Sequence, residues 1–562
     1  MVIVAKLPDF VNNYWGQLRF HKDDKNKKAR LKNMNKKMLV LLPVLTLLAS
    51  GLAGCGGDNN NIENQPNETS AASTETKSPS GPPTTLTVEV FDRGIQGQPD
   101  LNNNTWTRYI NEHFGKPNNA VVKFVPVPRS QEIDKLNVMM AAGEAPDISF
   151  TYDSATVSRY AKINGIMPLE DLLEKYGQDL KKYLGETVLT YGQFNGKQMA
   201  IPAKRTSLAW IGSFIRKDWL DKLGLPVPTN RDELYNTLVA FRDKNPGGVD
   251  GVIPWGLAAT GMNYGTGNLA ESFWGEQSEE DFVTSPNWLK PGNKESLKFL
   301  NKLYNEKLIS PDFALDKTAK QADADVTNGK VGFFSANWDY AFRQNISEPL
   351  KANVPDANFI PIDTFKNDEG KYKKLIYNEN GLNVFIPKSS KNAELAIKYL
   401  NWMANPDVLF FLQYGEEGVN HKTVDGIPQV IAQTGDNMQM SPQNLDYTLV
   451  VNGVELGDQE KNIKALSASY AGLEETAEQS YKINTTDGYT SFFYDTPNDA
   501  NIKYGKTLGD LNKQMTDKLI VCKPSDFDSL YDKLVDEYMA AGGKAVMEEN
   551  VKIYEAMQAN KK

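Results

Sequence analysis

Strand-like and helix-like patterns of apolar residues alternate along the chain once it has passed Pro83. Period-two patterns predict strands at 86–91, 121–125 and 147–150, and period-3.6 patterns predict helices at 106–114 and 133–142. Gly143 can end the second helix in the left-handed conformation. Strands that alternate with helices form a mainly parallel sheet covered by helices, so the predicted fold class is α/β.

In such sheets, ligands bind beyond the carboxyl ends of the strands. This rule selects two loops, Asp92-Arg93-Gly94 after the first strand and Thr151-Tyr152-Asp153-Ser154 after the third. Arg93, Tyr152 and Asp153 are therefore candidate ligand-binding residues. An ion pair at the surface or at a hinge is the alternative role for Arg93 and Tyr152, and also for Arg205 further along the chain.

The pattern changes between two further predicted strands, at 198–202 and 209–215, where a polar stretch indicates a crossing from one lobe to another. Arg205 lies in this stretch. A second crossing is expected near 374–380, where Asn378 is the candidate, with an ordinary loop residue as the alternative. Helices follow the first crossing, one closed by Gly224 and the next begun by a Thr229/Asp232 capping box.

The N-terminal region has the features of an export signal. Lys36 and Lys37 precede an apolar stretch of about ten residues, whereas roughly 20 are needed to cross a bilayer. The run Leu52-Ala53-Gly54-Cys55 resembles a bacterial lipoprotein box, which implies that Cys55 is lipidated and that residues 1–54 are removed, with translation starting at Met34. A transmembrane helix is the alternative. Residues 55–83 are polar and predict a disordered tether.

Composition narrows the possible functions. A mature chain of roughly 500 residues exceeds the size of one hydrophobic core, so two lobes are expected. The net charge of −9 is spread along the chain and makes nucleic acid an unlikely partner. The chain has three histidines and two cysteines, which is too few to favour a histidine metal site or a serine hydrolase. No cofactor is predicted. Cys522 is interpreted as a packed thiol.

Several stretches occur in an order and spacing that resemble a known family. In chain order they are Phe91-Asp92-Arg93-Gly94, residues 104–111, Val125-Pro126-Val127-Pro128-Arg129-Ser130 continuing to residues 141–148, residues 215–225, residues 229–241, Gly329-Lys330-Val331-Gly332 and Tyr414-Gly415-Glu416-Glu417-Gly418. They resemble the family 1 extracellular solute-binding proteins of ABC importers, in the large lipoprotein subgroup related to maltose-binding protein.

The resemblance implies a two-lobed periplasmic-binding-protein-like fold (type II) with a ligand cleft between the lobes. One lobe is assigned to 84–204 and 376–430, and the other to 205–375 and 431–562. It further implies a monomer without enzymatic activity, anchored by lipid to the extracellular face of the bacterial membrane, that delivers a solute to ABC permease subunits.

Relatives in this subgroup often carry a calcium loop after the helix that starts at Thr229. Here residues 243–250 read Asp-Lys-Asn-Pro-Gly-Gly-Val-Asp, so glycine and valine replace probable oxygen ligands. No metal site is predicted.

The tryptophan content favours an oligosaccharide as the ligand, because sugar rings stack on tryptophan while their hydroxyls need polar partners. Trp210, Trp274 and Trp338 are predicted stacking platforms, since they lie in loop-like settings, and core packing is the alternative for each. Arg93, Asp153, Arg205 and Asn378 are predicted to bind hydroxyl or carboxylate groups.

Three other interpretations stay open at this stage. A secreted glycoside hydrolase needs two carboxylates across the scissile bond, and 71 acidic residues always allow such a pair to be nominated. A sensing lipoprotein could use the same scaffold without a transporter. The solute could also be a peptide or a polyamine.

Overall fold

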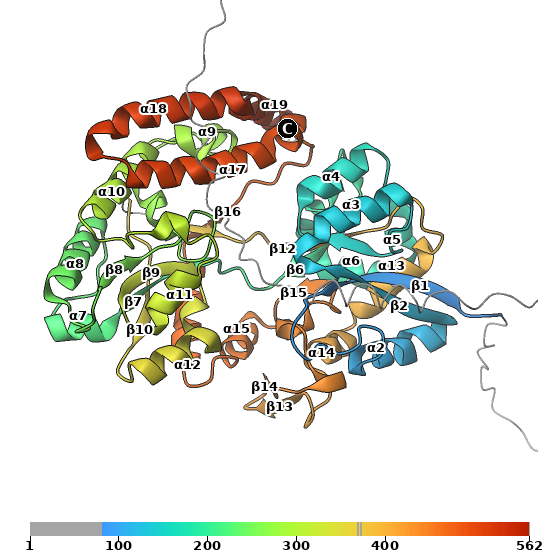
Figure 1. Cartoon of the computed structure of the whole chain (residues 1–562). Coiled ribbons are helices and arrows are strands. Elements are labelled where there is room, and N and C mark those ends of the chain that lie inside the picture. Colours follow the sequence, from blue (N-terminus) through green and yellow to red (C-terminus); the bar gives the residue numbers. More distant parts are fainter. Residues whose placement is uncertain (1–80, 368–369, 371–373, 561–562) are drawn as a thin grey trace, which may run out of the picture. The chain divides into compact units, whose positions relative to one another are not determined.

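Two four-stranded sheets organise the protein in the computed structural model, which describes residues 81–367, 370 and 374–560 (Figure 1). The first sheet has the order β15-β6-β12-β3, with bounds Val451–Asn452, Ile201–Arg205, Asn380–Phe385 and Ser149–Thr151. The second has the order β10-β7-β9-β8, with bounds Phe359–Ile362, Ile211–Arg216, Val331–Asn337 and Ile253–Gly256.

The three predicted N-terminal strands run parallel. β1 (Thr84–Asp92) pairs in parallel with β2 (Ala120–Pro128), and Val88 forms a parallel bridge with Ile148 just before β3. The prediction of a mainly parallel sheet is nevertheless wrong for the first four-stranded sheet, because β12 pairs antiparallel with both β3 and β6. β12 returns from the second half of the chain, and no local pattern specifies the direction of such a return.

The predicted helix ends are confirmed where glycine provides them. α3 (Glu132–Ala142) ends at Gly143 and α7 (Lys217–Leu223) ends at Gly224, with φ of 72° and 65°. The predicted Thr229/Asp232 capping box is wrong by one residue, since the Asn230 side chain accepts from the backbone N–H of Glu233 at the start of α8.

The remaining helices and short strands complete the element order. The helices are α2 (Thr105–Ile110), α4 (Ser154–Lys162), α5 (Glu170–Tyr176), α6 (Gln178–Thr190), α8 (Arg231–Lys244), α9 (Glu279–Thr284), α10 (Asn293–Asn305), α11 (Lys320–Thr327), α12 (Gln344–Asn353), α13 (Ala393–Met403), α14 (Pro406–Tyr414), α15 (Gln459–Ser467), α16 (Glu474–Thr485), α17 (Asp499–Val521), α18 (Phe527–Tyr538) and α19 (Lys544–Asn560). The strands are β4 (Gln193–Phe194), β5 (Lys197–Gln198), β11 (Lys374–Ile376), β13 (His421–Val424), β14 (Ile427–Val430) and β16 (Gly488–Thr490).

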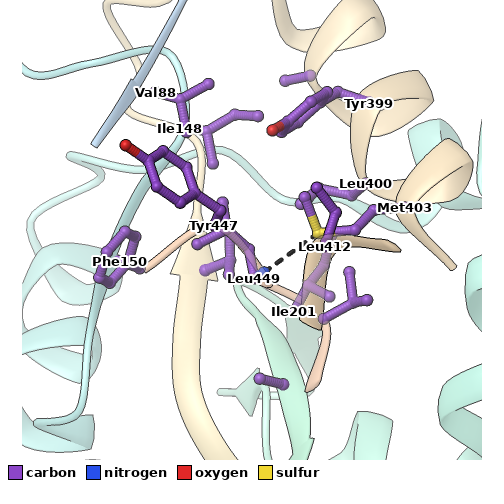
Figure 2. Close-up of a cluster of buried hydrophobic side chains, with 14 of the residues drawn as sticks. Val88, Ile148, Phe150, Ile201, Tyr399, Leu400, Met403, Leu412, Tyr447 and Leu449 are labelled. Atoms are coloured by element: carbon purple, nitrogen blue, oxygen red, sulfur yellow. Dashed lines mark hydrogen bonds between the residues drawn. The ribbon is translucent and has the colours of Figure 1, made fainter. Parts of the chain in front are cut away.

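The first sheet and β1 share a hydrophobic core with helices from two distant parts of the chain (Figure 2). Tyr447 and Leu449 enter this core beside Met403 of α13, and the Leu449 N–H donates to the Met403 Sδ at 3.1 Å. Residues of the segment 440–451 therefore pack with the first sheet, although the sequence assigned them to the second lobe. The exact lobe boundaries stay a prediction.

The second sheet carries separate cores. One of them combines β7 and β9 with α8, α10, α17 and α18, and the other packs α11 and α12 against residues of β7 and β9. The three C-terminal helices lie beside α9 and α10 (Figure 1). Among the described residues, no helix is both long and apolar enough to span a membrane.

The chain passes between the two four-stranded sheets at three segments. Residues 206–210 connect β6 to β7, residues 363–379 lead from β10 back to β12, and the chain leaves the first sheet again after β15. The first two coincide with the polar stretches in which the sequence placed its crossings.

Glu89 is one of several acidic side chains that are buried around the first sheet. Glu89 of β1 is fully buried, and one of its carboxyl oxygens accepts from the Phe150 N–H at 2.9 Å. Its other oxygen has no hydrogen-bond partner among the described residues. Burial raises the pKa of Glu89 to about 8.

This raised pKa predicts a pH-dependent loss of stability. The unfolded chain releases the Glu89 proton near pH 4.5 and the folded protein holds it to about pH 8, so folding becomes less favourable across that interval. Each unit of pKa shift corresponds to about 1.4 kcal/mol. Glu89→Gln removes this titration, so its stability relative to the wild type should rise by about 1 kcal/mol or more from pH 5 to pH 8.

Urea unfolding at both pH values measures the effect. Glu144→Gln is the matched control, because Glu144 is exposed. Identical pH dependence in wild type and Glu89→Gln would contradict the assignment.

Candidate functional site

The carboxyl ends of β1, β2 and β3 bring three polar residues together. Arg93, Arg129 and Tyr152 follow these strands within one or two residues. The Tyr152 ring lies parallel to that of Phe91, with centroids 6.4 Å apart and an interplanar angle of 20°. The Arg129 guanidinium lies over both rings, at 4.7 Å from the Phe91 centroid and 5.1 Å from that of Tyr152.

Two residues from a distant segment hold this group in place. The Arg93 Nε donates to Asp446, whose side chain is fully buried, at 2.8 Å. The Asn452 amide donates to the Tyr152 hydroxyl oxygen at 2.9 Å. Burial raises the pKa of Tyr152, although nearby arginines oppose the shift. Tyr152 therefore stays protonated, and its hydroxyl can donate a hydrogen bond to a ligand.

A second aromatic group lies at the chain crossings. Arg205 is the last residue of β6, and its guanidinium carbon lies 4.2 Å from the centroid of Tyr377. Trp210 stacks on Tyr377, with centroids 5.1 Å apart and an angle of 25°. The Arg205 Nε donates to the carbonyl oxygen of Asn380 at 3.1 Å. Each ring comes from a different crossing segment.

Arg205 links the two groups, because its guanidinium lies on the Tyr377 ring and its charge also opposes the rise in the pKa of Tyr152. We call the site the crossing-strand cluster. It consists of Phe91, Arg93, Arg129, Tyr152, Arg205, Trp210 and Tyr377. Of these residues Phe91 is buried, Arg129 is exposed and the others are half-buried. The cluster offers stacking surfaces and cationic donors, which is the combination that polar ring-shaped ligands require.

An ion-pair network lies next to Tyr377. Asp339 accepts from Arg343 at 2.8 and 2.9 Å and from the Tyr470 hydroxyl at 2.8 Å. Asp339 and Arg343 both interact electrostatically with Tyr377. The charges of Asp339 and Arg343 balance each other, so this network adds no net charge near Tyr377.

The cluster includes four of the predicted ligand-binding residues, Arg93, Tyr152, Arg205 and Trp210. Asp153 lies beside Tyr152, but its carboxylate caps α4 by accepting from the N–H groups of Ala155 and Thr156. Asn378 follows Tyr377, and its amide donates to the carbonyl oxygen of Ser491 at 3.0 Å.

The two other predicted tryptophans are covered by neighbouring side chains. Trp274 is 3% exposed, and the Lys290 ammonium lies 4.4 Å from its ring centroid. Trp338 is 7% exposed and packs edge-on against Tyr470 and Tyr481. Their predicted contact with a ligand stays a prediction.

Sequence reasoning missed five residues of the site and its support: Phe91, Arg129, Tyr377, Asp446 and Asn452. Arg129 could have been found, because it follows the second parallel strand and the strand-end rule applies to that loop as well. Tyr377 lies in the stretch that was identified as a crossing. Asp446 and Asn452 gave no local signal, since their partners lie about 300 residues or more away in the sequence.

Other features of the predictions lie away from the cluster. In residues 243–250, the Asn245 side chain exchanges two hydrogen bonds with the backbone of Val249. No group of three or more potential metal ligands occurs among the residues that the structure describes. The Cys522 thiol is half-buried and donates to the carbonyl of Leu519 at 3.2 Å, and burial raises its pKa. Cys55 lies outside the described residues.

Comparison with solved structures identifies the class of fold. The chain resembles the alginate-binding protein AlgQ2, with a TM-score of 0.61 and 19% identity over 86% of this chain and 99% of that one. It also resembles the Streptococcus pneumoniae substrate-binding protein FusA in complex with kestose, with a TM-score of 0.61 and 17% identity over 85% and 100%. The fold is therefore the predicted α/β fold of two-lobed solute-binding proteins.

Sequence comparison then identifies the family. The profile of the bacterial extracellular solute-binding proteins matches residues 99–409, which is more than half of the chain, so the protein belongs to this family. It is 25% identical to the polygalacturonan/rhamnogalacturonan-binding protein YtcQ of Bacillus subtilis, over 92% of this chain and 98% of YtcQ. It is 28% identical to the lipoprotein LipO of the same organism, over 54% of this chain and 62% of LipO.

The position of Asn452, which holds Tyr152 in place, leads to a prediction about stability. A Cβ at Gly381 of β12 would lie 2.4 Å from the Cβ of Asn452, which is too close for two carbon atoms. Gly381→Ala should therefore displace Asn452 and destabilise the protein by about 1–3 kcal/mol, the usual cost of overpacking. Denaturant unfolding measures this loss.

Gly509→Ala in α17 is the matched control. No atom lies within 4 Å of its added Cβ, and alanine favours the helix, so stability should stay equal or rise by up to about 1 kcal/mol. Unchanged stability of Gly381→Ala would show that β15 can move away from β12 without cost.

Proposed function

We propose that this protein captures an oligosaccharide between its two lobes and delivers it to the permease of an ABC transporter. The single observation that carries the proposal is the stack of Arg205, Tyr377 and Trp210 at the crossings of a solute-binding fold. Aromatic faces bind the apolar faces of sugar rings, and the adjacent guanidinium and hydroxyl groups bind their polar edges. No cofactor is needed for this activity.

The names of the relatives support a saccharide ligand. YtcQ is named for polygalacturonan and rhamnogalacturonan. A second relative, FusA of Streptococcus pneumoniae, is named a fructooligosaccharide ABC transporter substrate-binding protein and is 27% identical over 49% of this chain and 53% of FusA. Polygalacturonan carries carboxylates and fructooligosaccharides carry no charge, so these names support a sugar without selecting its charge.

The acidic groups of the cluster favour binding over hydrolysis. A glycosidase needs one carboxylic acid and one carboxylate facing the scissile bond. Here Asp446 is fully buried against Arg93, and Glu132 pairs with Arg129 and accepts from the Thr151 hydroxyl at 2.8 Å. Both carboxylates form ion pairs with arginines, so we propose that the ligand leaves the site chemically unchanged.

Capture requires motion at the three crossing segments. We propose an open form that admits the sugar and a closed form in which both lobes contact it. A ligand shifts this equilibrium only by the difference between its affinities for the two forms. Trp210 and Tyr377 lie on different crossing segments, which makes their stack sensitive to that motion.

The location follows from the N-terminal sequence and from the family. The family is extracellular. We propose that lipid on Cys55 anchors the protein to the outer face of the cell membrane, with residues 56–83 as the tether, and that it acts as a monomer beside the permease.

Removal of one stacking face should weaken sugar binding. Trp210→Ala and Tyr377→Ala should each lose about 1 kcal/mol or more, roughly five- to tenfold in affinity, for the tightest ligand of an oligosaccharide panel. Isothermal titration calorimetry measures the affinities. Tyr176→Ala, on α5, is the control and should bind as the wild type does, because the Tyr176 hydroxyl donates to Glu394, which lies outside the cluster.

Two results would overturn the proposal. Wild-type affinity in both cluster variants would remove the stack from the binding site. Release of shortened products from the bound saccharide, detected by chromatography, would make the protein an enzyme.

The anchor is tested separately in cells. Cys55→Ser should abolish lipid attachment and move the protein from the membrane fraction into the medium or the soluble fraction, because no thiol remains for acylation. Cys522→Ser is the control and should stay in the membrane fraction. Membrane retention of Cys55→Ser at wild-type levels would contradict lipid anchoring at this residue.

A further inference from the structure

Three arginines gather around one tyrosine in the crossing-strand cluster. Arg93, Arg129 and Arg205 all interact electrostatically with Tyr152. Neighbouring charges of one sign repel each other, so nearby anions stabilise such an arrangement. The partners of each arginine decide how complete that balance is.

Two of the three arginines have their own carboxylate. Arg93 pairs with the buried Asp446, and Arg129 pairs with Glu132, which is 6% exposed. These pairs belong to the protein and leave no charge for a ligand to neutralise.

Arg205 has no such partner. Its Nε donates to a backbone carbonyl, and its flat face lies on the Tyr377 ring. Within residues 81–367, 370 and 374–560, no carboxylate forms a salt bridge with Arg205, and its two terminal nitrogens donate no hydrogen bond. The side chain is half-buried, and this partial burial lowers the pKa of Arg205. Arg205 thus carries a positive charge that no described carboxylate pairs with.

Neighbouring acids do not supply the missing charge. Glu379 gives its backbone carbonyl to the Arg205 N–H at 2.7 Å, but its exposed carboxylate acts on Tyr191. Asp339 is already paired with Arg343. None of the acids in the described part of the chain supplies the anion that would complete the site.

We propose that the captured saccharide is acidic, and that the terminal nitrogens of Arg205 bind a carboxylate of a uronic acid unit. The inference rests on the proposed function and adds the charge of its ligand. A guanidinium presents two parallel N–H donors that match the two oxygens of a carboxylate. Tyr377 fixes the plane of the guanidinium, while Trp210 and the Tyr152 hydroxyl remain available to the sugar ring.

A neutral sugar would satisfy the site less well. Its hydroxyls can accept hydrogen bonds from Arg205, but they leave the positive charge uncompensated when the lobes exclude water. An unpaired buried charge is strongly unfavourable, whereas a paired and hydrogen-bonded one is tolerated. The acidic ligand therefore gains most in the closed form.

The test compares charged and neutral forms of the same sugars. The probes are oligomers of galacturonate, mannuronate, guluronate and glucuronate-substituted xylose, each with its methyl-esterified counterpart, together with unmodified neutral oligosaccharides. Calorimetry should find the tightest binding for a uronate oligomer, with its methyl ester at least about tenfold weaker, as expected for loss of a charge-assisted hydrogen bond.

The variants Arg205→Gln and Arg205→Lys assign the effect to this side chain. Arg205→Gln should abolish most of the acid-over-ester ratio, and Arg205→Lys should keep part of it, because lysine keeps the charge and loses the fork. General damage to the site would weaken both ligand forms together and leave their ratio unchanged. Arg108→Gln, which removes an exposed pair with Asp436, is the control and should keep the wild-type ratio.

Each outcome decides between the two proposals. Tightest binding of a neutral oligosaccharide, or an acid-over-ester ratio near one, would overturn the acidic ligand and leave the proposed function intact. A wild-type ratio in Arg205→Gln would also overturn the role of Arg205. Binding of no saccharide, charged or neutral, would overturn the proposed function itself and this inference with it.

Discussion

The pairing of β6 with two strands from distant parts of the chain is the constraint on which the site depends. Lys204 of β6 is opposite Asn380 of β12 on one side and Val451 of β15 on the other. The hydrogen bonds continue past the strand, since the Arg205 N–H donates to the Glu379 carbonyl and the Thr206 N–H to that of Asn452. One short strand therefore sets the positions of all three crossing segments relative to the first sheet.

The electrostatics of the cluster follow from that constraint. Asp446 precedes β15 and Asn452 is part of it. The register of β15 with β6 therefore places Asp446 next to Arg93 and Asn452 next to Tyr152. Arg205, at the end of the central strand, faces Tyr377 from the neighbouring crossing instead of a carboxylate. A cation on an aromatic face is stabilised less than one in a bidentate ion pair, which leaves Arg205 able to gain from an anion.

Local sequence signals predicted the elements and one edge of the site. Parallel strands with apolar alternation end at Arg93 and Tyr152, and glycines in the left-handed conformation end helices at Gly143 and Gly224. These features are encoded within a few residues, so a single sequence reveals them. The antiparallel return of β12 and the burial of Asp446 depend on residues hundreds of positions away, which no local pattern contains. The same limit applies to Trp338, whose loop-like sequence gave no sign that Tyr470 and Tyr481 would cover its ring.

The stack of Arg205, Tyr377 and Trp210 is ordered before a ligand binds, and this affects how a ligand could act on both lobes. Tyr377 already packs against Arg205 and Trp210, so an incoming sugar would not have to order these side chains, and that entropy is spent during folding. A pre-ordered face by itself favours open and closed forms equally and shifts no equilibrium. The part of the interaction that differs between the forms must therefore come from groups whose environment changes on closure. Arg205 meets that condition best, because no described carboxylate pairs with its charge and every loss of surrounding water strengthens its attraction for a bound carboxylate.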